Sequence, residues 1–289
     1  MELIKNIFDS WQLNVILAIT FSVIYVQYYK LAAKDTPNEW VATIILELLG
    51  ALGALVMVPF FAFKYSLDTR TMLLLLVACI FYALNDGLKT VARKKLEVSV
   101  FSIIDQLTKV FLIIYGIVLF HNEIVTTKLI GGALIIFGNV ALFYNRKKIR
   151  INKYVWLSML TALLMATALA IDVDISTKFN LPFYVMLTLI IPAIFNYALA
   201  RCPLKNIIHE FNSSRKKNYL ISGLATGPMI FFVIRSLQLG QMTFIAPLLA
   251  TTVLLNVLVA SVLHKEKTSL NKKIAIAVII IIGVFLTVI

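Results

Sequence analysis

The sequence has little charge, few cysteines and no long polar segment. Charged residues make up 14% of its 289 residues, whereas soluble domains carry about 25%. The two cysteines, Cys79 and Cys202, indicate neither a disulfide framework nor a metal site. The longest polar segment, Arg201 to Lys217, is expected to be a loop. The sequence therefore leaves no room for a soluble domain.

Apolar runs fill almost all of the chain. Hydrophobic residues make up 61% of the sequence, and its mean hydropathy is +0.92. A hydrocarbon core of roughly 30 Å needs about 20 apolar residues of helix to span it. Ten runs approach or exceed this length, over residues 11–32, 40–63, 71–92, 98–120, 128–145, 154–175, 181–200, 218–238, 242–263 and 273–289. The predicted fold class is an all-α polytopic membrane protein with ten transmembrane helices.

The positive charge of the chain lies mainly in short loops. A net charge of +13 would suit nucleic acid, but cations confined to loops between spans are better explained as topology signals. Most of them follow odd-numbered spans. We call that end of the bundle the cation-rich side and the opposite end the cation-poor side. The positive-inside rule predicts that the cation-rich side is cytoplasmic, with both termini outside, in a plasma (inner) membrane.

The two halves of the sequence are weakly similar. Residues 96–143 align without gaps over residues 239–286, and His121-Asn122-Glu123 then meets His264-Lys265-Glu266. Each half holds five spans, an odd number, so the second half must enter the membrane with opposite orientation. Inverted repeats of this kind are typical of secondary transporters. We expect the two five-helix repeats to occupy residues 1–145 and 146–289.

The end of the first half resembles an EamA domain. Leu119-Phe120-His121-Asn122-Glu123 closes the fourth predicted helix, and glycines are spaced along the next, from Gly131 to Gly138. A weaker second copy runs from Ser261 to Gly283 and includes Glu266. With ten spans in two sets of five, the whole chain resembles the drug/metabolite transporter superfamily, EamA type. The resemblance implies alternating access and a central cavity lined mainly by helices 1, 3 and 4 of each half. It also implies that both termini are cytoplasmic, whereas the distribution of charge predicts that they lie outside.

Ionisable residues lie at membrane depth in the third and fourth spans. Such groups are costly in a bilayer and normally face a protein interior or a water-filled cavity. Asp86 and Lys89 are three residues apart, and Asp105 and Lys109 are four apart, so each pair shares one helical face. The loop at 94–97 is short, which makes these helices antiparallel neighbours. We expect a network of two acids and two bases that binds substrate or gates its path.

A second polar group lies nearer the cation-poor side. Asp172 ends the sixth span and Arg235 ends the eighth, so an ion pair between these two predicted substrate-binding or gate residues is geometrically allowed. Glu47, alone in the second span, is a candidate for proton coupling or for a contact between helices. The polar residues that we predict to line a cavity are Asn14, Asn85, Gln106 and Asn256.

The predicted function is a secondary transporter that moves a small polar or zwitterionic metabolite by alternating access. No nucleotide-binding motif is present, so a gradient or an exchange would drive transport, with a coupling proton or an exchanged metabolite as partner. Two alternatives stay open: a flippase or carrier for a lipid-linked sugar or head group, and an intramembrane aspartyl enzyme. The motifs of aspartyl intramembrane proteases are absent around Asp86 and Asp105, so no enzyme is expected. The histidines lack metal-ligand spacing, and no metal or cofactor is predicted. A homodimer is left open.

Overall fold

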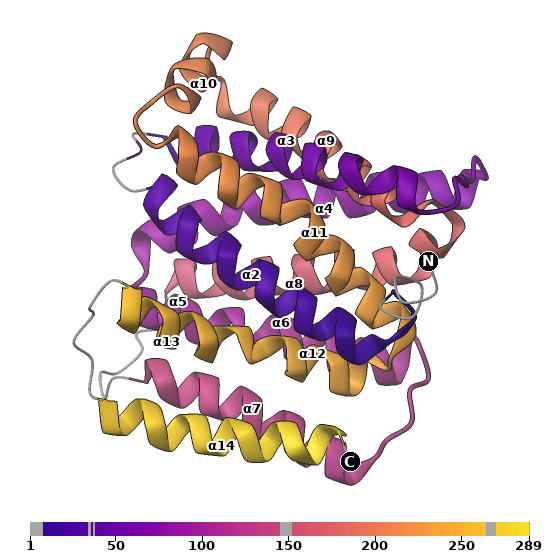
Figure 1. The fold of residues 1–289 in the computed structure, drawn as a ribbon, viewed down its shortest axis with the longest axis vertical. Coiled ribbons are helices and arrows are strands. Elements are labelled where there is room, and N and C mark those ends of the chain that lie inside the picture. Colours follow the sequence, from indigo (N-terminus) through magenta and orange to yellow (C-terminus); the bar gives the residue numbers. More distant parts are fainter. Residues whose placement is uncertain (1–7, 34–35, 37, 145–151, 264–269, 289) are drawn as a thin grey trace.

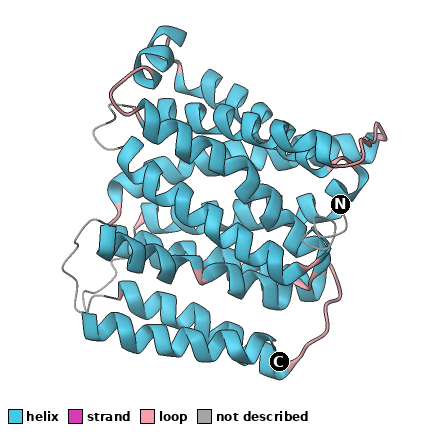
Figure 2. Cartoon of the chain, viewed as in Figure 1, coloured by secondary structure: helices cyan, strands magenta, loops and turns pink. Residues whose placement is uncertain are grey.

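A computed structural model describes residues 8–33, 36, 38–144, 152–263 and 270–288. These residues form a bundle of long helices joined by loops and turns (Figures 1 and 2). The helices are α2 (Trp11–Ala32), α3 (Glu39–Met57), η1 (Val58–Phe60), α4 (Thr69–Lys95), α5 (Val98–Asp105), α6 (Leu107–Val118), α7 (Thr126–Phe143), α8 (Lys153–Ile175), η2 (Ser176–Lys178), α9 (Leu181–Ala200), α10 (Leu204–Phe211), α11 (Lys216–Leu239), α12 (Met242–Ala250), α13 (Thr252–Leu263) and α14 (Leu270–Val288).

The described residues include nine helical segments that are long and apolar enough to cross a membrane. A shorter apolar stretch, Ala275–Val288 of α14, follows the last of them. The helices run back and forth along the bundle, and α2 begins at the end where α14 finishes (Figure 1). The expected multi-pass, all-helical membrane protein is confirmed at this level.

Short polar side chains set several helix starts. Ser10, Asn38, Asp68, Asn152 and Asn180 precede α2, α3, α4, α8 and α9, and each accepts a hydrogen bond from a backbone N–H of the first turn. This satisfies donors that have no partner within the helix. The boundaries therefore follow the expected spans closely, except where a helix breaks.

The second, fourth and ninth spans are not continuous helices. α3 ends at Met57 and passes into η1, where Pro59 cannot donate a backbone hydrogen bond. The fourth span breaks at Gln106 and the ninth at Thr251. Thr251 follows four residues after Pro247.

Asn139 of α7 joins the two internal breaks. It is fully buried, and its Nδ2 donates to the backbone oxygen of Ala250 at 2.9 Å and to Oε1 of Gln106 at 3.4 Å. A side chain that binds a carbonyl at a helix break makes the interruption tolerable within a bilayer.

Glycines allow close helix packing at two places. A Cβ placed on Gly227 of α11 would meet backbone atoms of Gly50 and Ala54 in α3. In the α7–α14 pair, a Cβ on Gly131 would lie 2.6 Å from the oxygen of Gly283. Small residues at such contacts are the usual means of packing membrane helices. Other extensive contacts join α2 to α11, α4 to α8, and α3 to α9.

The segment Arg201 to Lys217 is not only a loop, as the sequence analysis expected. It contains α10, a two-turn helix that packs on α3 at the end of the bundle (Figure 1). Glu210 at its end is buried and binds Arg215 at 2.6 Å and the hydroxyl of Tyr219 at 2.8 Å. This buried acid holds the short helix against the bundle.

Candidate binding cavity

A cavity of about 470 Å³ lies among the helices of both halves of the chain. At the cation-rich side its lining includes Tyr29 in the last turns of α2 and Glu39 at the start of α3. Toward the cation-poor side its lining becomes apolar, as with Leu112 and Leu237. The volume is within the range of pockets that hold small molecules.

The charged residues of the third and fourth spans line this cavity together. Nζ of Lys89 in α4 binds Oδ1 of Asp105 in α5 at 2.8 Å, which joins the two helices. Asp86 and Lys109 line the same cavity. No ion pair or hydrogen bond joins Lys109 to another of the residues that the structure describes. The network is therefore one close pair with a further acid and a further base.

Glu47 of α3 also lies at this cavity and is 6% exposed. Its Oε1 accepts a hydrogen bond of 2.8 Å from Nδ2 of Asn196 in α9. Its carboxyl group is also in contact with that of Asp86. Asp86 in turn accepts from Nδ2 of Asn85 at 2.9 Å. Four polar side chains from three helices thus form a connected cluster, in which Glu47, Asn85 and Asp86 line the cavity and the fully buried Asn196 does not.

Three of the four predicted lining residues are where the sequence analysis placed them. Asn85, Gln106 and Asn256 line the cavity, and Asn256 accepts from Nε2 of Gln27 at 2.9 Å. Asn14 was assigned wrongly. It is buried near the start of α2 and outside the cavity lining, and its Nδ2 donates to the backbone oxygen of Ser10 at 2.7 Å.

Asp172 and Arg235 do not form the ion pair that their positions in the sequence allowed. Arg235 binds Oδ1 of Asp9 at 2.9 Å and the backbone oxygen of Phe8 at 2.9 Å. Asp172 is fully buried and accepts from the hydroxyls of Tyr82 at 2.5 Å and Tyr184 at 2.7 Å. Neither Asp172 nor Arg235 belongs to the cavity lining. Each of the two residues therefore binds other partners that lie closer to it.

Aromatic side chains pack across the cation-poor side of the bundle. The rings of Phe8 and Phe61 are 4.7 Å apart, those of Phe61 and Phe231 are 5.1 Å apart, and Phe232 stacks on Phe21 at 5.7 Å. Rings from α2, α11 and the η1–α4 connection therefore fill this end of the molecule.

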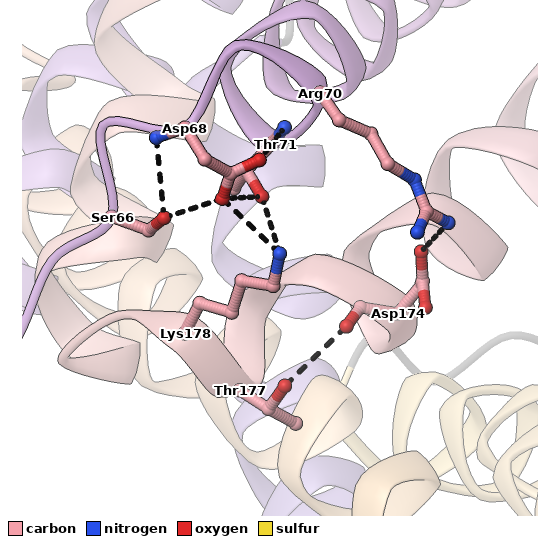
Figure 3. A network of polar contacts seen from close by, with 7 residues as sticks. All are labelled: Ser66, Asp68, Arg70, Thr71, Asp174, Thr177 and Lys178. Atoms are coloured by element: carbon pink, nitrogen blue, oxygen red, sulfur yellow. Dashed lines mark hydrogen bonds and ion pairs between the residues drawn. The ribbon is translucent and has the colours of Figure 1, made fainter.

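Two ion pairs at the same end of the molecule join helices of the two chain halves (Figure 3). Lys178 in η2 binds Oδ2 of Asp68 at 3.1 Å, and Arg70 in α4 binds Asp174 in α8 at 3.3 Å. Asp68 also accepts from the hydroxyls of Ser66 and Thr71, each at 2.6 Å. Hydrogen bonds from Ser66 and then Thr71 hold the pKa of the Asp68 carboxyl well below its usual range. At the cation-poor side, polar contacts between the chain halves thus join the start of α4 to η2 and to the end of α8.

Several residues of the site were not predicted from the sequence. Asn196, Tyr82, Tyr25 and Tyr29 were not singled out, although the last three line the cavity. Tyr82 precedes Asp86 by four residues and so shares its helical face, a signal that was available in the sequence. The pairing of Asn196 with Glu47 left no local signal, because 149 residues separate the two. The second His-x-Glu copy, with Glu266, lies outside the described residues.

Comparison with known proteins identifies the fold but no family. No protein-family model matches the sequence, and no curated protein matches it. A solved structure described as "Crystal structure of protein" superposes with a TM-score of 0.75, over 96% of this chain and 96% of its own, at 11% identity. The chain is a polytopic, all-helical membrane protein. At this identity the likeness shows the fold alone.

Proposed function

We propose that this membrane protein is a secondary transporter that carries a small polar or zwitterionic metabolite by alternating access. One observation carries the proposal. A cavity of about 470 Å³ with acidic and basic side chains reaches the cation-rich side, whereas aromatic rings and ion pairs close the cation-poor side. Alternating access requires such a state, in which a site inside the bundle opens to one face only.

Two features of the helices support a pair of inverted five-helix repeats and a place in the EamA-type drug/metabolite transporters. The fourth and ninth spans, equivalent under the repeat, both break internally, at Gln106 and Thr251. The first span packs on the eighth and the sixth packs on the third. Exchange of the two halves converts each of these contacts into the other, as a pseudo-twofold axis requires.

The chemistry of the cavity favours a solute with charged groups. Lys109 forms no ion pair with a described residue, although the charge of Asp105 acts on it, and its ammonium group offers a contact for a solute anion. Glu47 and Asp86 offer acceptors, and either carboxyl is suited to carry a coupling proton. The Lys89–Asp105 pair argues against an aspartyl enzyme, because the base rather than a second aspartate faces Asp105.

Transport in reconstituted vesicles tests the function. Purified protein would be placed in liposomes loaded with amino acids, amines, sugar phosphates, nucleotide sugars or lipid-linked sugars, and counterflow of the labelled compound would be measured. We expect uptake of one class of small polar solute and at least about tenfold less with Lys109→Gln. Glu123→Gln, an exposed charge change outside both the cavity and the ion pairs of the cation-poor side, is the control. Movement of the lipid-linked sugars alone would favour the flippase, and no movement of any class would refute the transporter.

The orientation and the membrane are part of the same proposal. We infer that the protein lies in the plasma (inner) membrane. The positive-inside rule then predicts that the cation-rich side, which the cavity reaches, faces the cytoplasm. Single cysteines would be introduced at the exposed positions Leu67 and Lys205. The one that a membrane-impermeant thiol reagent labels in intact cells lies on the outer side, which decides the orientation.

A further inference from the structure

The wall of the cavity has the opposite charge balance to the chain. The whole protein has a net charge of +13. Among the residues that the structure describes, the cavity lining contains four carboxyl groups, those of Glu39, Glu47, Asp86 and Asp105, against the two ammonium groups of Lys89 and Lys109. An acidic cavity in a strongly basic protein favours a positively charged occupant, since charges of one sign in a low-dielectric cleft concentrate the opposite sign.

The excess of acid is concentrated in the cluster of Asn196, Glu47, Asp86 and Asn85. The cluster is chained by the hydrogen bonds from Asn196 to Glu47 and from Asn85 to Asp86, and by the contact between the two carboxyls. Lys89, the nearest described base, has its ammonium group on Asp105 at 2.8 Å. Among the described residues, no ion pair joins Glu47 or Asp86 to a cation.

Three oxygens of this cluster are buried without a hydrogen-bond donor. They are Oε2 of Glu47, Oδ1 of Asn85 and Oδ1 of Asn196, in side chains that are 6%, 4% and 0% exposed. Buried polar atoms in folded proteins are almost always paired, because an unpaired one loses its hydrogen bond to water without replacement. All three atoms are acceptors, so each of them lacks a donor or a cation.

A proton alone is not a sufficient partner. One proton shared between Glu47 and Asp86 satisfies the contact between the carboxyls but leaves the two amide oxygens unpaired. Water supplies two donors but no charge. A cation supplies both, because carboxylate and amide oxygens are the ligands that hard cations prefer and that an ammonium group can hydrogen-bond.

We propose that Glu47, Asp86, Asn85 and Asn196 form a binding site for a small cation, either an alkali ion or a primary ammonium group. Glu47 and Asp86 supply the charge, and the two asparagines supply neutral oxygens after donating their N–H groups to the carboxylates. Tyr82 adds to the same wall. Its hydroxyl donates to Asp172, so toward the cavity its oxygen can only accept. If the cation is the ammonium end of a transported solute, that part of the inference rests on the proposed function.

Thermal unfolding of the purified protein in detergent tests the site without transport. The probes are the chlorides of sodium, potassium, methylammonium and tetramethylammonium, added at constant ionic strength with choline chloride as the replacement salt. Since a ligand that binds only the folded state raises Tm, we expect a saturable rise with sodium or methylammonium. We expect none with tetramethylammonium, which has the same charge but no N–H donor and cannot reach buried oxygens.

Variants assign the effect to the cluster. Glu47→Gln and Asn196→Leu should raise the half-saturating concentration at least about tenfold, whereas Glu123→Gln, a matched loss of an exposed carboxylate, should leave it unchanged. If Glu47→Gln does not fold, Asp86→Asn provides the charge variant, because its side chain is only partly buried. A response to sodium alone identifies an ion site, and a response to methylammonium alone identifies an ammonium subsite.

Two results would overturn the inference. One is that no salt raises Tm more than tetramethylammonium does, and the other is that the variants respond as the wild type does. Either result, together with solute counterflow in vesicles, leaves the transporter standing. Cation binding without any counterflow leaves the site standing and removes the transporter.

Discussion

Replacing the Asp172 carboxylate alone should destabilise the protein. Replacing it together with the two tyrosine hydroxyls that it binds should destabilise the protein less. Asp172 is 0% exposed and accepts from the hydroxyls of Tyr82 and Tyr184 at 2.5 and 2.7 Å. In Asp172→Leu both hydroxyls lose their acceptor. The orphaned hydroxyl of the fully buried Tyr184 costs about 1–3 kcal/mol, whereas Tyr82 lines the cavity and its hydroxyl can bind water, so the single variant should lose about 1–3 kcal/mol of unfolding free energy.

The triple variant Asp172→Leu, Tyr82→Phe, Tyr184→Phe has no orphaned group. Replacing all partners of a buried network by apolar groups of similar shape is often nearly neutral, so the triple variant should recover most of this loss. Equilibrium unfolding in mixed micelles of a mild detergent and sodium dodecyl sulfate would measure both. A single variant within about 1 kcal/mol of the wild type, or a triple variant no more stable than the single, would refute the reasoning.

Three further predictions concern packing, pH and the charged pair. Gly227→Leu should cost about 1–3 kcal/mol or prevent folding, because its side chain would enter the backbone of α3 at Gly50, and unfolding in mixed micelles would show it. The pKa of Asp68 is lower in the folded state than in the unfolded state. Its contribution to the free energy of unfolding is therefore complete above an unfolded pKa of about 3.9 and is lost as the pH falls below that value. Tm of the wild type should then fall more steeply with acid than Tm of Asp68→Asn. Lys89→Gln should lower Tm more than the double variant Lys89→Gln, Asp105→Asn does, since the single change removes the ammonium group from Asp105. A larger loss of Tm in the double variant would exclude the pair as a structural contact.

The amino-acid sequence by itself determined the local features of this protein. Runs of about 20 apolar residues are a direct consequence of bilayer thickness, and the spans follow them closely. Helical spacing also placed Asp86 with Lys89 and Asp105 with Lys109, because residues three or four apart share a face. A short loop then brought Lys89 to Asp105.

The tertiary structure alone decided which distant helices meet. Asp172 and Arg235 lie at similar depths, yet each found a nearer partner, because depth fixes a position along the bundle but not around it. The same freedom hid the contact of Glu47 with Asn196, two residues on helices far apart in the chain. Helical periodicity specifies one face of one helix, whereas the acidic cluster at the cavity exists only where faces of α3, α4 and α9 are packed together.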